Sequence, residues 1–314
     1  MRVFLSGGTG VVGQAITKAL RSRGDEVVVL TRAASKAEAL WPNGEVDIVE
    51  GDPAYEGDGT WQQKISGCDA VINLAGEPLD AERWTARFRQ MIHDSRIDST
   101  RFLAEAICAI TTAQRPKCLL NASGVDYYGF AELVNFDSDD VAEGDPGGES
   151  FLSGLCWDWE DETKICDAAG VRVALMRMGV VLSRRGALPK LAAPHRRGVG
   201  GRLGGGRQWV SWIHIDDVVG AFLHVLDSDL SGPVNVVAPG PVRNVEFAKT
   251  LAGVLGKRSW LAVPEFALYA AVGQLAEYIL KGRRTVPKAL RDNGYEFVFP
   301  RLEPALSGLL STKQ

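Results

Sequence analysis

One short segment near the N-terminus restricts the fold of this chain more than any other. The apolar run Val3–Ser6 leads directly into the sequence GGTGVVG at positions 7–13, and a helical pattern follows at once. A strand, a glycine turn and a helix in this order let the backbone approach a pyrophosphate and point helix N-terminal amide groups at it. We therefore expect a dinucleotide site here rather than a plain turn. The predicted contacts are Gly7, Gly10, Val11, Val12 and Gly13.

Short apolar runs alternate with longer helical patterns over most of the chain. Strands that are buried on both faces have this composition, and the helices between them supply the crossovers of a parallel sheet. The fold class predicted is α/β, a Rossmann-type doubly wound parallel sheet over residues 1–238. The runs are Val3–Ser6, Glu26–Leu30, Ala70–Leu74, Lys117–Ala122, Val171–Met176, Trp209–Ile213 and Val234–Val237.

The alternation stops near Pro239. A small, mainly helical C-terminal subdomain is expected over residues 239–314, covering the open end of the sheet. Its predicted elements are helices at Asn244–Leu255, Pro264–Leu280 and Val286–Asn293, the segment Tyr295–Phe299, and a last short helix. The glycine-rich stretch Gly198–Arg207 is expected to be a flexible loop, which either contacts a ligand or lies in solvent.

Charge and cysteine content narrow the class of protein. The net charge of −4 lacks the basic excess typical of nucleic-acid or anionic-membrane binders. The five cysteines form no CxxC pair, so we expect reduced thiols and no metal site. The apolar stretch Val263–Leu280 is interrupted by charged and polar residues, and the first strand starts at Arg2, so neither a membrane span nor a signal peptide is expected. The sequence predicts a soluble cytoplasmic protein with a small-molecule substrate.

The end of the second predicted strand indicates which dinucleotide is bound. A site that prefers NAD normally ends this strand with Asp or Glu, which binds the ribose 2′-hydroxyl. Here Leu30 is followed by Thr31 and Arg32. A guanidinium accepts a 2′-phosphate, so we expect Arg32, helped by Thr31 and Lys36, to select NADP(H). The alternative is an arginine exposed on a surface turn.

A second group of cofactor contacts is expected after the run Ala70–Leu74, because that strand ends at the edge of the sheet where the cofactor must lie. Glu77 is a candidate ribose contact, and Arg83 is a weaker one. The predicted contacts of this group are Leu74, Ala75, Gly76, Glu77 and Arg83.

Further segments occur in the order found in one known family. They are 72–78, 83–85, 95–97, 127–129, 179–182 and 212–217. In these segments and in the glycine loop, the chain resembles the extended and atypical short-chain dehydrogenase/reductases, and their epimerase-like family of unknown substrate, along essentially its whole length. The resemblance implies NADP(H), a C-terminal helical segment and a cofactor contact at Val180. Many relatives form dimers through helices, and a helix at Glu82–Ala113 is long enough for a homodimer.

Active members of this superfamily use a Tyr as general acid/base, a Lys four residues later that lowers the pKa of the Tyr, and a Ser that orients the substrate oxygen. Ser123 follows the run Lys117–Ala122, where that Ser is expected. No tyrosine occurs between Tyr128 and Tyr269, and alignment puts Leu152 and Cys156 in the tyrosine and lysine positions.

Ser123, Tyr127 and Tyr128 are therefore the candidate catalytic residues, although both tyrosines also fit an aromatic pair packed under a loop. Cys156 is interpreted as a core residue, since no histidine is near it in sequence. Asp126 stands beside the tyrosines where the family more often has glycine.

Substrate recognition is less defined. Nucleotide-sugar epimerases usually have an arginine shortly before the segment 213–217, where this chain has Val210, and this weakens the inference of a sugar nucleotide. Anion contacts or solvated charges are both possible for Arg196, Arg197, Arg202 and Arg207. His214, Asp216 and Asp217 are expected to cap a helix.

Two functions follow from the sequence. The first is an oxidoreductase, or an epimerase-like enzyme, that moves a hydride between NADP(H) and a carbonyl or alcohol carbon of a small substrate. The second is an NADP(H)-binding sensor or scaffold in which the fold is retained without the chemistry.

Overall fold

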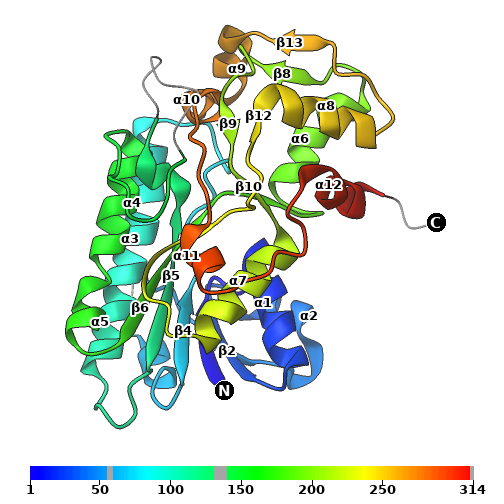
Figure 1. The fold of residues 1–314 in the computed structure, drawn as a ribbon. Helices are drawn as coiled ribbons and strands as arrows, with labels where there is room; N and C mark the ends of the chain where they lie inside the picture. Colours follow the sequence, from blue (N-terminus) through cyan, green and yellow to red (C-terminus); the bar gives the residue numbers. More distant parts are fainter. Residues whose placement is uncertain (55–58, 131–139, 312–314) are drawn as a thin grey trace.

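The computed structural model describes residues 1–54, 59–130 and 140–311, and its centre is a seven-stranded sheet with helices on both faces (Figure 1). Each strand of this sheet runs parallel to its neighbours. The Rossmann-type, doubly wound fold expected from the sequence is thereby confirmed. From one edge to the other the strands are β11 (Gly232–Val236), β6 (Arg172–Met178), β5 (Cys118–Gly124), β4 (Ala70–Asn73), β1 (Arg2–Ser6), β2 (Glu26–Thr31) and β3 (Asp47–Glu50).

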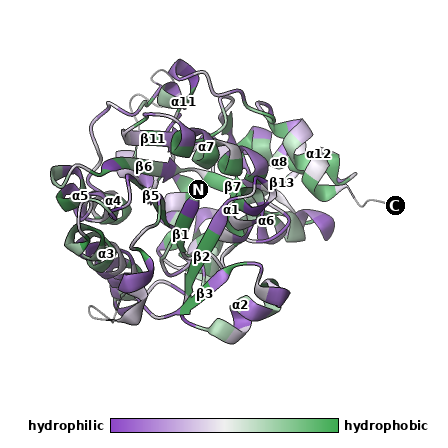
Figure 2. Ribbon diagram, turned by 90° about the horizontal axis from the view of Figure 1, so that it is seen from below, coloured by the Kyte–Doolittle hydropathy of each residue, from purple (hydrophilic) through white to green (hydrophobic). Residues whose placement is uncertain are grey.

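The helices divide into two layers, with the sheet between them (Figure 2). On one face, α1 (Val11–Ser22) and α7 (Ile215–Asp227) pack together on an apolar cluster that includes Ile16 and Phe222. On the other face, the layer contains α3 (Ala86–Ala109), α4 (Phe151–Asp161) and α5 (Lys164–Ala168). The central strands are covered on both sides, which is why they consist of almost continuous apolar residues.

The strand order changes direction between β1 and β4, because β2 follows β1 outward on one side whereas β4 and β5 continue on the other. In open α/β sheets, ligands bind outside the carboxyl ends of the strands at such a switch point. The carboxyl ends of β1 and β4 carry the glycine loop and the segment after Asn73, so the topology brings the two predicted cofactor segments together.

A second unit lies over the carboxyl edge of the sheet (Figure 1). It includes α8 (Asn244–Val254), α12 (Leu302–Leu310) and β13 (Leu261–Val263), but also a stretch that precedes residue 238. From that stretch, α6 (Ala187–Arg196) packs in the same apolar cluster as α8 and α12, while β8 (Gly201–Leu203) pairs with β13 and β9 (Trp209–Val210) pairs with β12 (Val242–Arg243). The unit is thus built from two separate parts of the chain.

Several expected elements differ in the structure. The glycine-rich stretch is partly ordered as β8, because its backbone pairs with a strand 60 residues later in the chain. The run Trp209–Ile213 divides into β9 and β10 (Trp212–His214), and β10 pairs with β7 (Val180–Leu182) outside the main sheet. The edge strand β3 was not expected, since its apolar run is only two residues long.

The C-terminal helices are also shorter than the sequence predicts. The helix expected over Pro264–Leu280 divides into α9 (Glu265–Val272) and α10 (Leu275–Leu280), because Gly273 adopts a positive φ of 64° that ends a helix. The remaining helices are α2 (Ala34–Leu40) and α11 (Lys288–Asp292). Among the helices of the described ranges, none combines the length and apolar character needed to cross a membrane.

Candidate functional site

The glycine loop between β1 and α1 is packed too closely for side chains. A Cβ on Gly7 would lie 2.6 Å from the backbone carbonyl of Leu74, and a Cβ on Gly13 would lie 2.4 Å from the Gly7 carbonyl oxygen. Gly7 also has φ 74°, in the left-handed region. The loop is closed by a hydrogen bond from Gly10 N–H to the Gly7 carbonyl at 3.0 Å. The chain therefore forms a bare backbone cradle at the switch point.

The first turn of α1 opens onto this cradle. The backbone N–H groups of Val11, Val12 and Gly13 have no acceptor within the helix, the N-cap Gly10 supplies no side-chain hydrogen bond, and the turn contains no acidic residue. Unsatisfied amides and the positive end of the helix dipole favour an anion at this position. The residues present therefore fit the pyrophosphate of a dinucleotide.

Arg32 stands at the end of β2, next to this cradle in the sheet order. Its side chain is 67% exposed and its guanidinium approaches Asp52 at 4.0 Å and Glu77 at 3.8 Å. Thr31 is buried, and its hydroxyl accepts a hydrogen bond from Ala33 N–H at 3.3 Å, so it shapes the turn that presents Arg32. A phosphate that bound this exposed guanidinium would compete with both carboxylates.

The segment after β4 faces the glycine loop. Leu74 N–H donates to the Ser6 carbonyl at 3.0 Å, and Ala75 N–H donates to the Asn73 side chain at 3.2 Å. Gly76 makes room for Arg96 of α3, whose Cζ would lie 3.0 Å from a Cβ at position 76.

Two of the predicted cofactor contacts, Val180 and Arg83, lie outside the glycine loop and the segment after β4. Val180 starts β7 and is 39% exposed. Arg83 packs beside Gly273, at the junction of α9 and α10, and so contacts the C-terminal unit.

The predicted catalytic hydroxyls of Ser123 and Tyr128 are held in a buried network. Ser123 Oγ donates to the Glu160 carboxylate at 2.7 Å, and Arg177 donates two hydrogen bonds to the same carboxylate at 2.8 and 2.7 Å. Arg177 also donates to Tyr128 OH at 2.9 Å, and Tyr128 OH donates to Asn235 at 2.7 Å. Only 3% of Ser123 and 1% of Tyr128 is exposed, so a direct reaction of either hydroxyl with a substrate requires the network to open.

Burial also makes Tyr128 a poor proton donor, since it raises the pKa of this phenol to about 12 against the opposing effect of Arg177. Tyr127 is partly buried: its ring lies 3.4 Å below the Arg177 guanidinium and stacks on Trp157. These contacts favour the packing interpretation of the two tyrosines.

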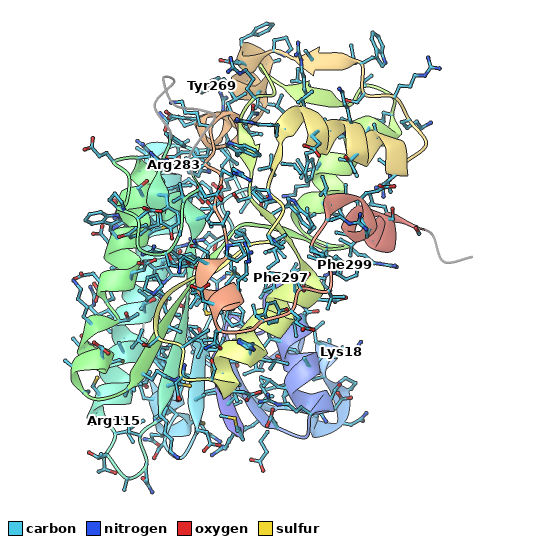
Figure 3. All side chains as sticks on the ribbon, in the orientation of Figure 1. Lys18, Arg115, Tyr269, Arg283, Phe297 and Phe299 are labelled. Atoms are coloured by element: carbon cyan, nitrogen blue, oxygen red, sulfur yellow. The ribbon has the colours of Figure 1, made fainter. Side chains whose placement is uncertain are left out.

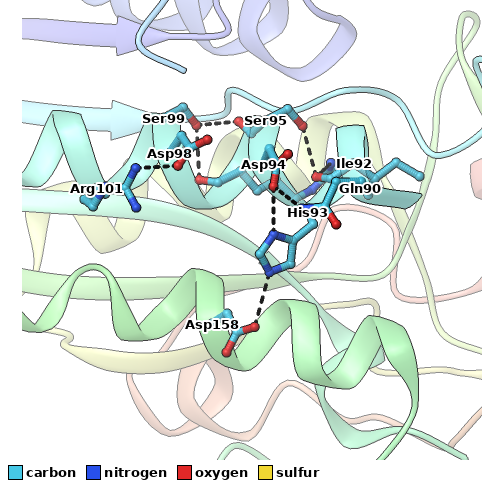
Figure 4. Close-up of polar contacts among 10 residues, drawn as sticks. Gln90, Ile92, His93, Asp94, Ser95, Asp98, Ser99, Arg101 and Asp158 are labelled. Carbon is cyan, nitrogen blue, oxygen red and sulfur yellow. Dashed lines mark hydrogen bonds and ion pairs between the residues drawn. The ribbon is translucent and has the colours of Figure 1, made fainter. Parts of the chain in front are cut away.

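Asp126 and Cys156 meet above Gly124, where β5 ends. A Cβ on Gly124 would lie 3.4 Å from Asp126 Oδ2 and 3.6 Å from Cys156 Sγ. Cys156 is buried, as the core interpretation expected, and burial raises the pKa of its thiol to about 12. His93 Nε2 of α3 lies 3.3 Å from Asp158 Oδ2 of α4, so this contact links the two helices (Figure 4).

An adjoining pocket of about 750 Å³ lies between α3, α4 and the C-terminal unit. Its wall is aromatic, with Trp84 and Phe130 packed on Tyr278 at centroid distances of 5.3 and 5.1 Å. Tyr278 OH accepts a hydrogen bond from Leu152 N–H at 3.3 Å, so the C-terminal unit contacts the first turn of α4.

Two arginines of this pocket, Arg89 and Arg283, form no ion pair with any carboxylate of the described chain. Figure 3 labels Arg283 near Tyr269, at the end of the molecule formed by α9 and α10. Sequence reasoning missed Tyr278 and Arg283, because only the fold brings the C-terminal unit against α4.

In the segment 214–217, His214 caps a helix as expected, whereas Asp217 contacts a different part of the chain. His214 is the N-cap of α7, with its Nδ1 accepting from Asp216 N–H at 3.1 Å. Asp217 accepts hydrogen bonds from Val298 and Phe299 N–H at 2.7 and 2.9 Å, and so fixes the C-terminal tail to α7.

The fold and the cradle define a Rossmann-type nucleotide-binding protein. The chain belongs to the NAD dependent epimerase/dehydratase family, which it matches over residues 3–238, and residues 263–309 match a domain of unknown function, DUF1731.

Two curated relatives are similar along the full length. The chain is 36% identical to the epimerase family protein YfhF of Bacillus subtilis, covering 100% of this chain and 99% of YfhF. It is 34% identical to human epimerase family protein SDR39U1, covering 99% and 100% of the two chains. A crystal structure of the human protein with NADPH has a TM-score of 0.85 at 34% identity, covering 98% of this chain and 99% of that one. The UDP-glucuronic acid 4-epimerase of Bacillus cereus shares the fold, with a TM-score of 0.77 at 16% identity and 98% of each chain covered.

Proposed function

We propose that this protein binds NADP(H) at the switch point between β1 and β4, and uses it to reduce or oxidise a carbonyl or alcohol carbon of a small substrate. The observation that carries the proposal is the bare cradle at the N-terminus of α1, with the exposed Arg32 at the end of the adjacent strand. The presence of NADPH in the structure of the human relative supports the choice of cofactor.

The roles of the residues follow from their positions. The amides of Val11, Val12 and Gly13 bind the pyrophosphate, and Arg32 binds the 2′-phosphate. Leu74, Ala75, Gly76 and Glu77 line the ribose side, and Val180 contributes its exposed side chain from β7. When bound, the cofactor supplies the hydride, and the protein supplies binding and orientation.

The aromatic pocket beside Tyr278 is the proposed substrate site. It adjoins the end of β5, since Gly148 in its wall donates a backbone hydrogen bond to the Tyr127 carbonyl at 2.8 Å. Arg89 and Arg283 favour a substrate with a negative group, because each has a guanidinium without a carboxylate partner in the described residues.

Cofactor choice is tested by titrating the protein with NADPH and NADH by calorimetry, after removal of any co-purified nucleotide. We expect NADPH to bind more tightly, and Arg32→Ala to raise the Kd for NADPH at least tenfold while leaving that for NADH nearly unchanged. Arg83→Ala is the matched control, because Arg83 lies beside Gly273. Equal effects of Arg32→Ala on both cofactors would contradict the assignment.

A second function, an NADP(H)-binding sensor or scaffold, is favoured by one observation. The hydroxyls of Ser123 and Tyr128 are both committed to the buried Arg177–Glu160 network. A panel of carbonyl compounds, with and without a carboxylate, separates the two functions through the oxidation of NADPH. Turnover supports the enzyme, whereas tight NADPH binding without turnover on any compound supports the sensor.

A further inference from the structure

The carboxylate of Asp126, at the end of β5, forms no ion pair with any residue of the described chain. Asp126 lies in the single helical turn Val125–Tyr128 that follows β5. Its backbone carbonyl accepts hydrogen bonds from Gly129 N–H and Ser153 Oγ, but its carboxylate forms no ion pair and receives no hydrogen bond from another described residue. Asp126 is only partly exposed, and a partly desolvated carboxylate without such partners is unfavourable, which is a feature that concentrates at functional sites.

The place of this carboxylate is the second part of the argument. Its Oδ2 and Cys156 Sγ both lie close to Gly124, and Cys156 is the residue that the sequence alignment proposes for the lysine position of the superfamily. Four residues earlier on the same helix, Leu152 replaces the tyrosine and points into an apolar cluster. Asp126 thus stands where the missing pair would have placed its polar groups.

Charged and titratable groups face Asp126 from each neighbouring element. Arg96 of α3 attracts the carboxylate electrostatically and thereby favours its ionised form, while burial raises the pKa of the carboxyl to about 6. Arg96 itself has no ion pair in the described chain: it donates to the Ile92 carbonyl at 3.1 Å and lies over Trp159.

The other titratable neighbours of Asp126 are Cys156 and Tyr278, which would both be anions if ionised and would repel its carboxylate. Glu77 attracts Arg96 electrostatically and so favours the charged guanidinium. Burial raises the pKa of the Cys156 thiol to about 12 and also raises the pKa of the Tyr278 phenol, so neither titrates between pH 5 and 8.

We propose that Asp126 is the catalytic residue that exchanges the proton at this site, and that Arg96 is its positioning residue. This inference rests on the proposed function. In the direction of reduction, the substrate carbonyl carbon gains a hydride from NADPH, which becomes NADP⁺. The C=O π electrons form an O–H bond with the proton of the Asp126 carboxyl, and the resulting carboxylate regains a proton from water.

The proposal makes a prediction about binding that needs no substrate. The oxidised nicotinamide ring is a cation and the reduced ring is neutral, so an ionised Asp126 stabilises bound NADP⁺ but not bound NADPH. The Kd for each is measured by calorimetry from pH 5 to 8, and their ratio is taken at each pH. Titration of the 2′-phosphate is common to both forms of the cofactor and cancels in the ratio.

We expect the ratio of Kd for NADP⁺ to Kd for NADPH to fall about tenfold as the pH rises through about 6, since an opposite charge nearby lowers a carboxyl pKa by about 1–3 units. In Asp126→Asn the ratio should stay within about twofold over the same range. Asp126→Gly, the residue more frequent in the family, gives the same test if the amide variant does not fold.

One control locates the effect. Asp161→Asn removes an exposed carboxylate of α4 and should retain the transition. A ratio that is flat in the unmodified protein, or a transition that persists in both Asp126 variants or disappears with Asp161→Asn, overturns the role of Asp126 while leaving cofactor binding intact. Failure to bind either form of the cofactor overturns the proposed function itself.

Discussion

Replacing Glu160 by glutamine should strongly destabilise the fold. The Glu160 carboxylate accepts hydrogen bonds from Arg177 Nε at 2.8 Å, from Arg177 Nη2 at 2.7 Å and from Ser123 Oγ at 2.7 Å. Arg177 and Glu160 are 3% and 8% exposed, so solvent cannot replace these contacts. The pair also ties α4 to β6, which are adjacent to the end of β5.

The magnitude follows from the geometry of the pair. A buried bidentate pair that loses one partner leaves an uncompensated charge, at a cost of about 3–5 kcal/mol. Burial lowers the pKa of Arg177, but its hydrogen bonds and charge interaction with Glu160 outweigh this and raise it. In Glu160→Gln these raising interactions are lost, but the ordinary pKa of a guanidinium, which lies far above neutral pH, keeps Arg177 charged without its counter-ion. Relative to a typical unfolding free energy of about 5–15 kcal/mol, this loss is large.

The assay is urea unfolding followed by circular dichroism, with free energies taken from the midpoint and slope. Asp161→Asn is the control, since it removes an exposed carboxylate one residue away that pairs with Lys164, and it should cost at most about 1 kcal/mol. The double variant Glu160→Leu with Arg177→Met should lose less stability than Glu160→Gln, because neither charge is then left alone. A loss below about 1 kcal/mol in Glu160→Gln would refute the reasoning.

Three further predictions concern other parts of the chain. Gly13→Ala should raise the Kd for NADPH at least tenfold by calorimetry, because its Cβ would lie 2.4 Å from the Gly7 carbonyl oxygen, whereas Gly253→Ala meets no atom within 4 Å and should bind normally. Arg283→Ala should raise the KM of an active substrate only if that substrate has an anionic group, as steady-state kinetics would reveal. Burial lowers the pKa of His214 below 6.5, so the unfolded chain takes up this proton first and stability falls as the pH drops below about 6.5. His214→Asn keeps a capping side chain and should lose this part of the pH dependence in urea unfolding.

The parts of the molecule that sequence reasoning predicted are those determined by local pattern. Strands β1, β4 and β5 each contain a short apolar run that marks them in the sequence, and the glycine loop needs only residues 7–13 to be recognised. Arg177 shows why the rest was missed: it lies near the end of the core strand β6, and its partner Glu160 is separated from it by a helix and a turn. Tyr278 reaches the site across 126 residues of sequence, through its hydrogen bond with Leu152. No periodicity predicts such contacts, because they depend on how two units pack.

The same packing supports the proposal that the proton comes from a residue outside the expected set. Arg177 donates a hydrogen bond to the Tyr128 hydroxyl, and the Ser123 hydroxyl donates one to Glu160. Both hydroxyls are therefore part of the buried network. If either hydroxyl served as the acid, it would have to give up the hydrogen bond that it donates to Glu160 or to Asn235 in each turnover. The Asp126 carboxylate forms no ion pair and receives no hydrogen bond from another described residue, and it interacts with Arg96 only through charge. In our proposal, Asp126 is therefore the group at the end of β5 that changes protonation state while the Arg177–Glu160 network stays intact.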